Sequence, residues 1–129
     1  MIDRIEGLTS LKNLIQLSLY NNQIMRIEGL EGLTSLRKLY LEKNHIDRLE
    51  GLTGCRNLEE LYLSGQNTET EFTFDDYSLA AISGSLRYLD LGSSNVVHSK
   101  PLYYLERLEV LILKRNRISD FEDDVVPML

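Results

Sequence analysis

The sequence predicts an α/β solenoid with a parallel concave sheet of about five strands and short 3₁₀ or helical segments on the convex side. Leucines alternate over very short stretches, these stretches recur every 22 residues, and a second apolar pattern follows each one. Because a single short strand cannot bury its own leucines, stacked copies must share one core. Residues 1–129 are therefore expected to form a single domain.

The repeated unit is clearest between Leu36 and Leu58. It follows the pattern L-x-x-L-x-L-x-x-N-x-I-x-x-L-x-x-L, which is that of a leucine-rich repeat. Period-two alternation places the strand leucines inside and the intervening residues on the opposite face. The Asn should supply hydrogen bonds to backbone groups that leave the strand ladder. Five such units begin at Leu14, Leu36, Leu58, Leu86 and Leu108.

The convex segments of the first three repeats are nearly identical. They read R-I-E-G-L at residues 4–8 and 26–30 and R-L-E-G-L at residues 48–52. Such short segments predict 3₁₀ turns or extended chain rather than α-helix. The Arg and Glu columns can pair between repeats, although exposed pairs contribute only about 0–1 kcal/mol each.

Residues 64–85 form an irregular, longer repeat, because the spacing from Leu58 to Leu86 is 28 rather than 22. We expect Asp75 or Asp76 to cap a short convex helix that Gly84 ends. The helix residues expected to face the core are Tyr77, Leu79, Ala80, Ala81 and Ile82.

The same repeat leaves two smaller questions. Phe72 and Phe74 either pack as a short extended piece on the solenoid or form an exposed docking strip. The Asn of the third and fourth repeats sits one position late, at Asn67 and Asn95. The Asn row is therefore expected to bulge locally.

Both ends of the sequence suggest an incomplete solenoid. Residues 1–8 align with the second half of a repeat, so the chain begins in mid-repeat. No closing element is evident at the C-terminus, although the acidic residues 122–124 are a possible helix start. Because terminal repeats normally need polar caps, we infer a fragment of a longer protein or a chain whose open ends self-associate.

Charge and cysteine content exclude several classes of protein. A net charge of −6 argues against nucleic-acid binding through phosphates and favours a basic protein partner. The single cysteine, Cys55, excludes a disulfide framework and indicates a reducing, intracellular compartment such as the cytoplasm. The sequence contains neither a long apolar run nor a signal peptide, so it does not predict contact with a membrane.

No catalytic or cofactor motif is present, so the chain is not expected to be an enzyme. His45 and His98 are isolated in sequence from other metal ligands, and no nucleotide-binding or nucleophile motif occurs. Cys55 precedes Leu58 and is expected to be a half-buried, inert thiol. We expect neither a metal nor a cofactor.

The concave face is the candidate binding surface. Tyr residues form a diagonal across it with carboxylates at the border, and Tyr buries a large area while keeping a polar tip. The alternative is that Tyr is simply a good strand residue that stacks on its neighbours. The predicted partner-binding residues are Tyr20, Lys38, Tyr40, Glu42, Glu60, Tyr62, Tyr88, Asp90 and Ile112.

The 22-residue units with R-I-E-G-L segments resemble those of the sds22-like leucine-rich repeat family. Relatives in that family include axonemal dynein and spliceosomal proteins. The resemblance covers the whole chain and implies a non-catalytic scaffold that binds protein.

A sharper resemblance lies in residues 58–97. The F-D pair at Phe74-Asp75 and the S-L-x-x-I-S-x-S-L-R-Y-L run from Ser78 to Leu89 resemble the irregular repeat of the protein phosphatase 1 regulatory subunit 42 family, also called testis leucine-rich repeat proteins. That resemblance implies binding to the protein phosphatase 1 catalytic subunit. It also implies association with tubulin and with the cytoskeleton at the centrosome, cilium or flagellum, so the alternative function is a ciliary or centrosomal adaptor of tubulin or dynein.

Overall fold

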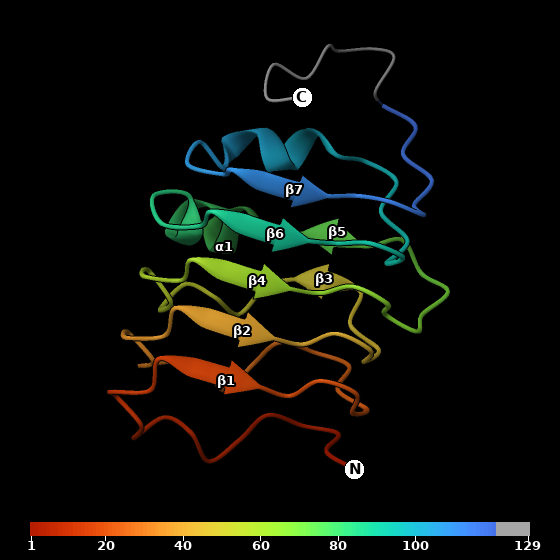
Figure 1. The fold of residues 1–129 in the computed structure, drawn as a ribbon. Helices are drawn as coiled ribbons and strands as arrows, with labels where there is room; N and C mark the ends of the chain where they lie inside the picture. Colours follow the sequence, from red (N-terminus) through yellow and green to blue (C-terminus); the bar gives the residue numbers. More distant parts are fainter. Residues whose placement is uncertain (121–129) are drawn as a thin grey trace.

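The computed structural model describes residues 1–120, which form a stack of parallel strands with return segments behind them (Figure 1). The sheet has five strands in the order β1-β2-β4-β6-β7. Expectations about acidic residues 122–124 and a C-terminal cap lie outside the described residues. The strands are β1 (Gln16–Ser18), β2 (Lys38–Tyr40), β4 (Glu60–Tyr62), β6 (Tyr88–Asp90) and β7 (Val110–Ile112).

The strands pair in the register that the repeat predicts. Leu39 pairs with Leu61 and Leu61 with Leu89, and all three side chains are 0% exposed. Each strand is only three residues long, so its middle leucine points inward while the residues on both sides face solvent. The core is therefore a column of leucines shared between repeats, which confirms the predicted solenoid fold.

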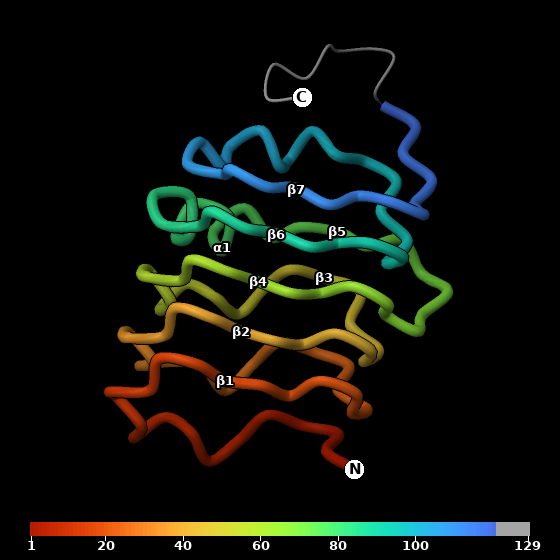
Figure 2. Tube along the Cα trace, viewed as in Figure 1, coloured from red at the N-terminus to blue at the C-terminus, as the bar shows by residue number. Residues whose placement is uncertain are grey.

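The convex side is built from short, varied segments. Figure 2 shows that the first repeats return as irregular chain without a helix. A second, two-stranded parallel sheet lies behind the main one, formed by β3 (Arg48–Leu49) and β5 (Thr73–Phe74). The α-helix α1 (Asp76–Ile82) and the 3₁₀ helix η1 (Lys100–Tyr104) complete this side. The mixture of extended and helical segments follows from the short length available to each return.

The Arg and Glu columns of the convex side pair between neighbouring repeats. Arg4 Nε lies 3.7 Å from Glu28 Oε2, and Arg26 Nε lies 3.4 Å from Glu50 Oε2. Both arginine side chains are about two-thirds exposed, so water screens these pairs. These ion pairs lie on the convex surface and contribute little to the stability of the fold.

Helix α1 begins and ends close to the predicted positions, but two of the expected core residues are exposed. Asp75 is the N-cap, and its carboxylate accepts a hydrogen bond from Ser78 N at 3.1 Å. Leu79 and Ile82 are buried, whereas Tyr77 is 79% exposed. The expectation that Tyr77 faces the core is wrong, because a two-turn helix presents one narrow stripe and Tyr77 lies outside it. Ala80 is likewise exposed.

Ser78 connects this helix to the preceding repeat. Its side chain is 0% exposed, and its Oγ accepts a hydrogen bond from Leu52 N at 3.0 Å. The hydroxyl therefore satisfies a buried backbone donor that the irregular repeat would otherwise leave unpaired. A polar residue in an apolar stripe thus positions α1 on the solenoid.

Phe72 and Phe74 pack on the solenoid and do not form an exposed docking strip. Phe72 is 1% exposed, Phe74 is partly buried against the core, and their ring centroids are 5.4 Å apart in an edge-to-face arrangement. The backbone between them pairs with β3. The extra residues of this repeat therefore enlarge the core.

The row of polar side chains beside the sheet passes through Gln66 and Ser94 rather than through Asn67 and Asn95. Asn44 is 0% exposed, and its Nδ2 donates to Leu41 O at 3.0 Å. In the next repeat Gln66, not Asn67, takes over this position, with Nε2 donating to Leu41 O at 2.8 Å. In the following repeat Ser94, not Asn95, takes the equivalent position, with Oγ donating to Leu63 O at 2.7 Å. Asn67 and Asn95 stand outside the row because hydrogen-bond reach, rather than amide identity, decides which side chain enters it. Asn95 has a φ of 63°, so the backbone departs from the regular repeat at that point.

Candidate functional site

Three tyrosines form a continuous stack on the concave face. Each occupies a neighbouring strand of the sheet, so the strand spacing of about 4.8 Å brings the rings into contact. The centroids of Tyr40 and Tyr62 are 4.5 Å apart with an interplanar angle of 8°. Tyr62 and Tyr88 follow at 4.9 Å with a tilt of 37°. The sheet thus presents one broad aromatic ridge with hydroxyl groups along it.

Polar partners hold the middle of the stack in place. Tyr62 Oη donates a hydrogen bond to Glu60 Oε1 at 2.6 Å, and Lys38 Nζ lies 3.5 Å from Glu60 Oε2. Burial and, secondly, the hydrogen bond to Glu60 raise the pKa of Tyr62 well above its usual value. Burial raises the pKa of Tyr88 too, with the charges of Asp90 and Glu60 adding to the effect. Tyr62 and Tyr88 are therefore neutral at physiological pH, and the hydroxyl proton of Tyr62 is held by Glu60.

Tyr20 does not belong to this stack, although the sequence predicts a single diagonal of four rings. Its side chain is 48% exposed, and Lys43 Nζ lies 5.5 Å from its ring centroid. Tyr20 occupies the position after the strand leucines, where Glu42 is its counterpart in the next repeat. The aromatic residues therefore form a stack of three and one separate cation–π pair.

Glu42 and Asp90 form the acidic border on the other side of the ridge. Burial raises the pKa of Glu42, a backbone hydrogen bond lowers it, and the charge of Asp90 raises it again. Asp90 Oδ1 accepts a hydrogen bond from Gly92 N at 2.9 Å. Ile112, the last predicted contact residue, is half-buried in β7 beside Asp90. The structure places all nine predicted residues on or beside one face of the sheet.

A hollow at one end of the ridge brings in residues that the sequence reasoning missed. It has a volume of about 290 Å³ and contains Glu60 and Tyr88 of the predicted set. Val110 is an apolar residue that is 43% exposed there, because it occupies the solvent-facing position before the second strand leucine. The sign of this hollow in the sequence was an apolar residue at a position that faces solvent. The additional lining residues are Glu59, Arg87, Glu109 and Val110.

Cys55 is buried completely rather than half-buried, at 0% exposure. Burial and the charge of Glu31 raise the pKa of its thiol to about 11, so the reactive thiolate is scarce at neutral pH.

Among residues 1–120, no group of three or more His, Cys, Asp or Glu side chains could hold a metal ion. In the same part of the chain, no helix combines the length and apolarity that a bilayer requires.

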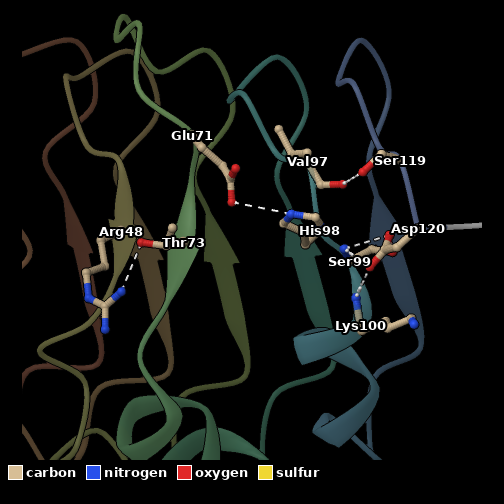
Figure 3. Close-up of polar contacts among 9 residues, drawn as sticks. All are labelled: Arg48, Glu71, Thr73, Val97, His98, Ser99, Lys100, Ser119 and Asp120. Atoms are coloured by element: carbon tan, nitrogen blue, oxygen red, sulfur yellow. Dashed lines mark hydrogen bonds and ion pairs between the residues drawn. The ribbon is translucent and has the colours of Figure 1, made fainter.

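Polar contacts behind the sheet join neighbouring repeats (Figure 3). Arg48 Nη1 donates to Thr73 Oγ1 at 2.9 Å, beside the pairing of β3 with β5. His98 Nε2 lies 4.0 Å from Glu71 Oε2, and both side chains are substantially exposed. Each contact joins two residues of consecutive repeats and has the character of a structural link.

A carboxylate also closes the start of the 3₁₀ helix η1. Asp120 is 6% exposed and accepts hydrogen bonds from Ser99 N, Ser99 Oγ and Lys100 N at 2.9–3.1 Å (Figure 3). Burial acts to raise the pKa of Asp120, but these hydrogen bonds outweigh it and the pKa lies below its usual value. An ionised side chain of the following repeat therefore satisfies the free backbone donors of η1.

The stacked strands, polar row and short return segments define a protein of the leucine-rich repeat class. The family model described as Leucine Rich repeats (2 copies) matches residues 12–54 and 34–76, which together span about half of the chain. The chain belongs to the leucine-rich repeat family. Comparison with curated proteins finds no sequence match.

Two solved structures share this architecture. A chain in the Drosophila melanogaster SNF/U2A′ complex matches with a TM-score of 0.78 and 20% identity, over 100% of this chain and 82% of that one. Internalin C2 from Listeria monocytogenes matches with a TM-score of 0.59 and 27% identity, over 99% of this chain and 64% of that one. The fold is thus that of a scaffold suited to protein–protein interaction, and proteins of this family are typically non-catalytic.

Proposed function

We propose that this chain is a non-catalytic scaffold whose concave face binds a protein partner. The observation that carries the proposal is the stack of Tyr40, Tyr62 and Tyr88. Rigid aromatic rings bury a large area on binding and lose little rotamer entropy. The core of the fold does not need them, since the buried leucines lie on the other side of the strands.

Two further features support a protein partner. The hollow beside Tyr88 offers a place for a side chain of the partner, with Val110 as its apolar wall. Glu42, Glu60 and Asp90 border the ridge and suit a partner surface that is locally basic. The structural neighbour from Drosophila melanogaster comes from the crystal structure of the SNF/U2A′ complex.

The catalytic subunit of protein phosphatase 1 is the first partner to test. This choice rests on the resemblance of residues 58–97 to the regulatory subunit 42 family, and the acidic border of the ridge is compatible with it. A regulatory or targeting subunit would bind the phosphatase through the ridge without contributing catalytic groups. The partner-binding residues proposed are Tyr20, Lys38, Tyr40, Glu42, Glu60, Tyr62, Tyr88, Asp90 and Ile112.

The test is a calorimetric titration of the phosphatase 1 catalytic subunit into the chain. The double variant Tyr40→Ala, Tyr62→Ala removes the first ring pair of the ridge, and its affinity should fall by about 10- to 100-fold if these rings are interface anchors. Tyr77→Ala is the matched control, because Tyr77 is an exposed tyrosine on α1, away from the concave strands. Its affinity should equal that of the unaltered chain.

Equal binding by the double variant and the unaltered chain would contradict the concave site. The absence of any binding to the phosphatase would instead overturn the choice of partner. A parallel titration with tubulin, or with a dynein chain, then tests the ciliary or centrosomal adaptor that the same resemblance implies.

A further inference from the structure

A second candidate binding surface lies on the convex side of the solenoid, between α1 and η1. It is a groove with a volume of about 450 Å³, lined by Asp76, Leu79, Ala80 and Ser83 from the α1 region and by Tyr104 and Glu106 from the η1 region. Helix α1 lies behind the sheet that carries the tyrosine ridge (Figure 1). The groove is therefore separate from the concave site.

The groove combines an apolar floor with an acidic rim. Leu79 is 1% exposed and belongs to the core, whereas Tyr104 is 68% exposed and presents its ring to solvent. Ala80 is exposed on the groove side of α1 and leaves room above the helix. The two charged lining residues, Asp76 and Glu106, are both carboxylates.

The irregular repeat supplies one side of this groove. The first repeats return as short chain without a helix, but α1 and η1 in successive repeats place two short helices in contact with each other. Helices with few residues leave a furrow between them that extended segments do not. The α1 side of the groove thus lies in the part of the chain that departs from the 22-residue period, whereas Tyr104 and Glu106 belong to the 22-residue repeat that follows.

We propose that this groove binds a short peptide segment in which one apolar side chain is flanked by lysine or arginine. The apolar side chain would occupy the space above Ala80 and beside the Tyr104 ring. The flanking cations would pair with Asp76 and Glu106. A volume of this size is typical of sites that enclose a few side chains or a small ligand.

Charge complementarity decides in favour of a basic peptide over other occupants. An acidic rim repels the phosphates of nucleic acids and the headgroups of anionic membranes. Two carboxylates that line an apolar groove from its two helical regions favour a ligand that carries positive charges beside an apolar group. The proposal does not depend on the concave site or on its partner.

The experiment is a titration of the ¹⁵N-labelled chain with the blocked heptapeptide Lys-Arg-Ser-Leu-Ser-Arg-Lys, followed by amide chemical shifts. We expect saturable shifts at Ala80, Ser83 and Glu106, with no comparable change at Tyr40, Tyr62 and Tyr88. A second peptide with serine in place of leucine tests the apolar contact. A third with glutamate in place of each cation tests the charges.

Two variants alter the groove without touching the leucine core. Glu106→Lys reverses one rim charge and Ala80→Arg fills the floor, and each should weaken peptide binding by about tenfold. Glu69→Lys is the matched control, since Glu69 is exposed and belongs to the segment between β4 and β5, which lies at the opposite edge of the solenoid from α1 (Figure 1). It changes the net charge equally and should leave the affinity within about twofold.

Three results would overturn the proposal. These are the absence of saturable shifts at millimolar peptide, shifts confined to the concave strands, and equal weakening by Glu69→Lys and Glu106→Lys. The last result would show attraction to the net charge of the chain alone. The circular dichroism spectrum of each variant establishes that it is folded before the titration is interpreted.

Discussion

At the scale of single residues, the polar row beside the sheet shows how geometry selects a side chain. Gln66 Oε1 accepts a hydrogen bond from Ile46 N at 2.9 Å, and its Nε2 donates to Leu41 O. The longer glutamine thus performs the role that asparagine has in Asn44. Asn67, one residue later, is exposed.

The assignment of Gln66 to this row can be tested against its neighbour. Gln66→Ala should lower the free energy of unfolding by about 2–4 kcal/mol, because it leaves buried backbone groups without partners. Asn67→Ala should change it by less than about 0.5 kcal/mol, as exposed substitutions usually do. Urea unfolding of both variants measures the difference, and a larger loss for Asn67→Ala would reverse the assignment.

The glycine of the R-L-E-G-L segment has a steric reason to recur. Gly51 has a φ of 71°, and a Cβ atom there would overlap the backbone carbonyl of Ile27 in the preceding repeat. Gly7 has a similar φ of 77° with nothing within 4 Å of such an atom. Only the first repeat, which has no neighbour before it in the described chain, escapes the close approach.

The two glycines therefore separate backbone strain from steric overlap. Gly7→Ala should lower the free energy of unfolding by about 1–2 kcal/mol, the usual penalty for a left-handed residue with a side chain. Gly51→Ala should lower it further, because the neighbouring repeat must also move. Thermal unfolding compares the two, and equal losses would show that the overlap relaxes without cost.

At the scale of elements, η1 depends on a side chain from the following repeat. The pKa of Asp120 is lowered by its hydrogen bonds to Ser99 and Lys100, which outweigh the effect of burial. A lowered pKa means that the folded state stabilises the ionised carboxylate. That contribution is present above the pKa of an unfolded aspartate, about 3.9, and is lost as the pH falls through the lowered value.

Asp120→Asn removes the charge while keeping the shape of the side chain. At neutral pH the variant should be less stable by about 1.5–3 kcal/mol, the usual contribution of hydrogen bonds to a charged group. The difference should shrink as the pH is lowered from about 5 to about 2, because the native carboxyl becomes protonated. Urea unfolding across this range tests the sign, and a constant difference would contradict the role of the charge.

At the scale of the whole molecule, burial is greatest in the middle of the solenoid. Leu39 is 0% exposed, whereas the equivalent Leu17 in β1 is only partly buried. Each repeat contacts its two neighbours alone, so a repeat with one neighbour in the described chain buries its leucines less completely. Stability is therefore distributed unevenly along the stack.

Equivalent leucines should consequently respond differently to truncation. Leu39→Ala should lower the free energy of unfolding by about 2–5 kcal/mol through the cavity that it leaves. Leu17→Ala should lower it by clearly less, since part of that side chain is already in contact with water. Denaturant unfolding of the pair provides the measurement, and equal losses would indicate that β1 is as well packed as β2.

The sequence by itself determined the repeat, the strand positions and the face that each strand residue occupies. Alternation with period two decides which face a residue takes, and the 22-residue period decides which residues stand side by side. Stacking of Tyr40 on Tyr62 follows from these two periods. For the same reason, all nine predicted contact residues lie on or beside one face.

The tertiary structure alone decided what happens where the period breaks. Exposure of Tyr77, burial of Phe72 and the entry of Gln66 into the polar row depend on distances to the neighbouring repeats. The groove between α1 and η1 depends on how two short helices lie against each other. A local pattern contains no information about those distances, because side chains and backbone from separate repeats set them together.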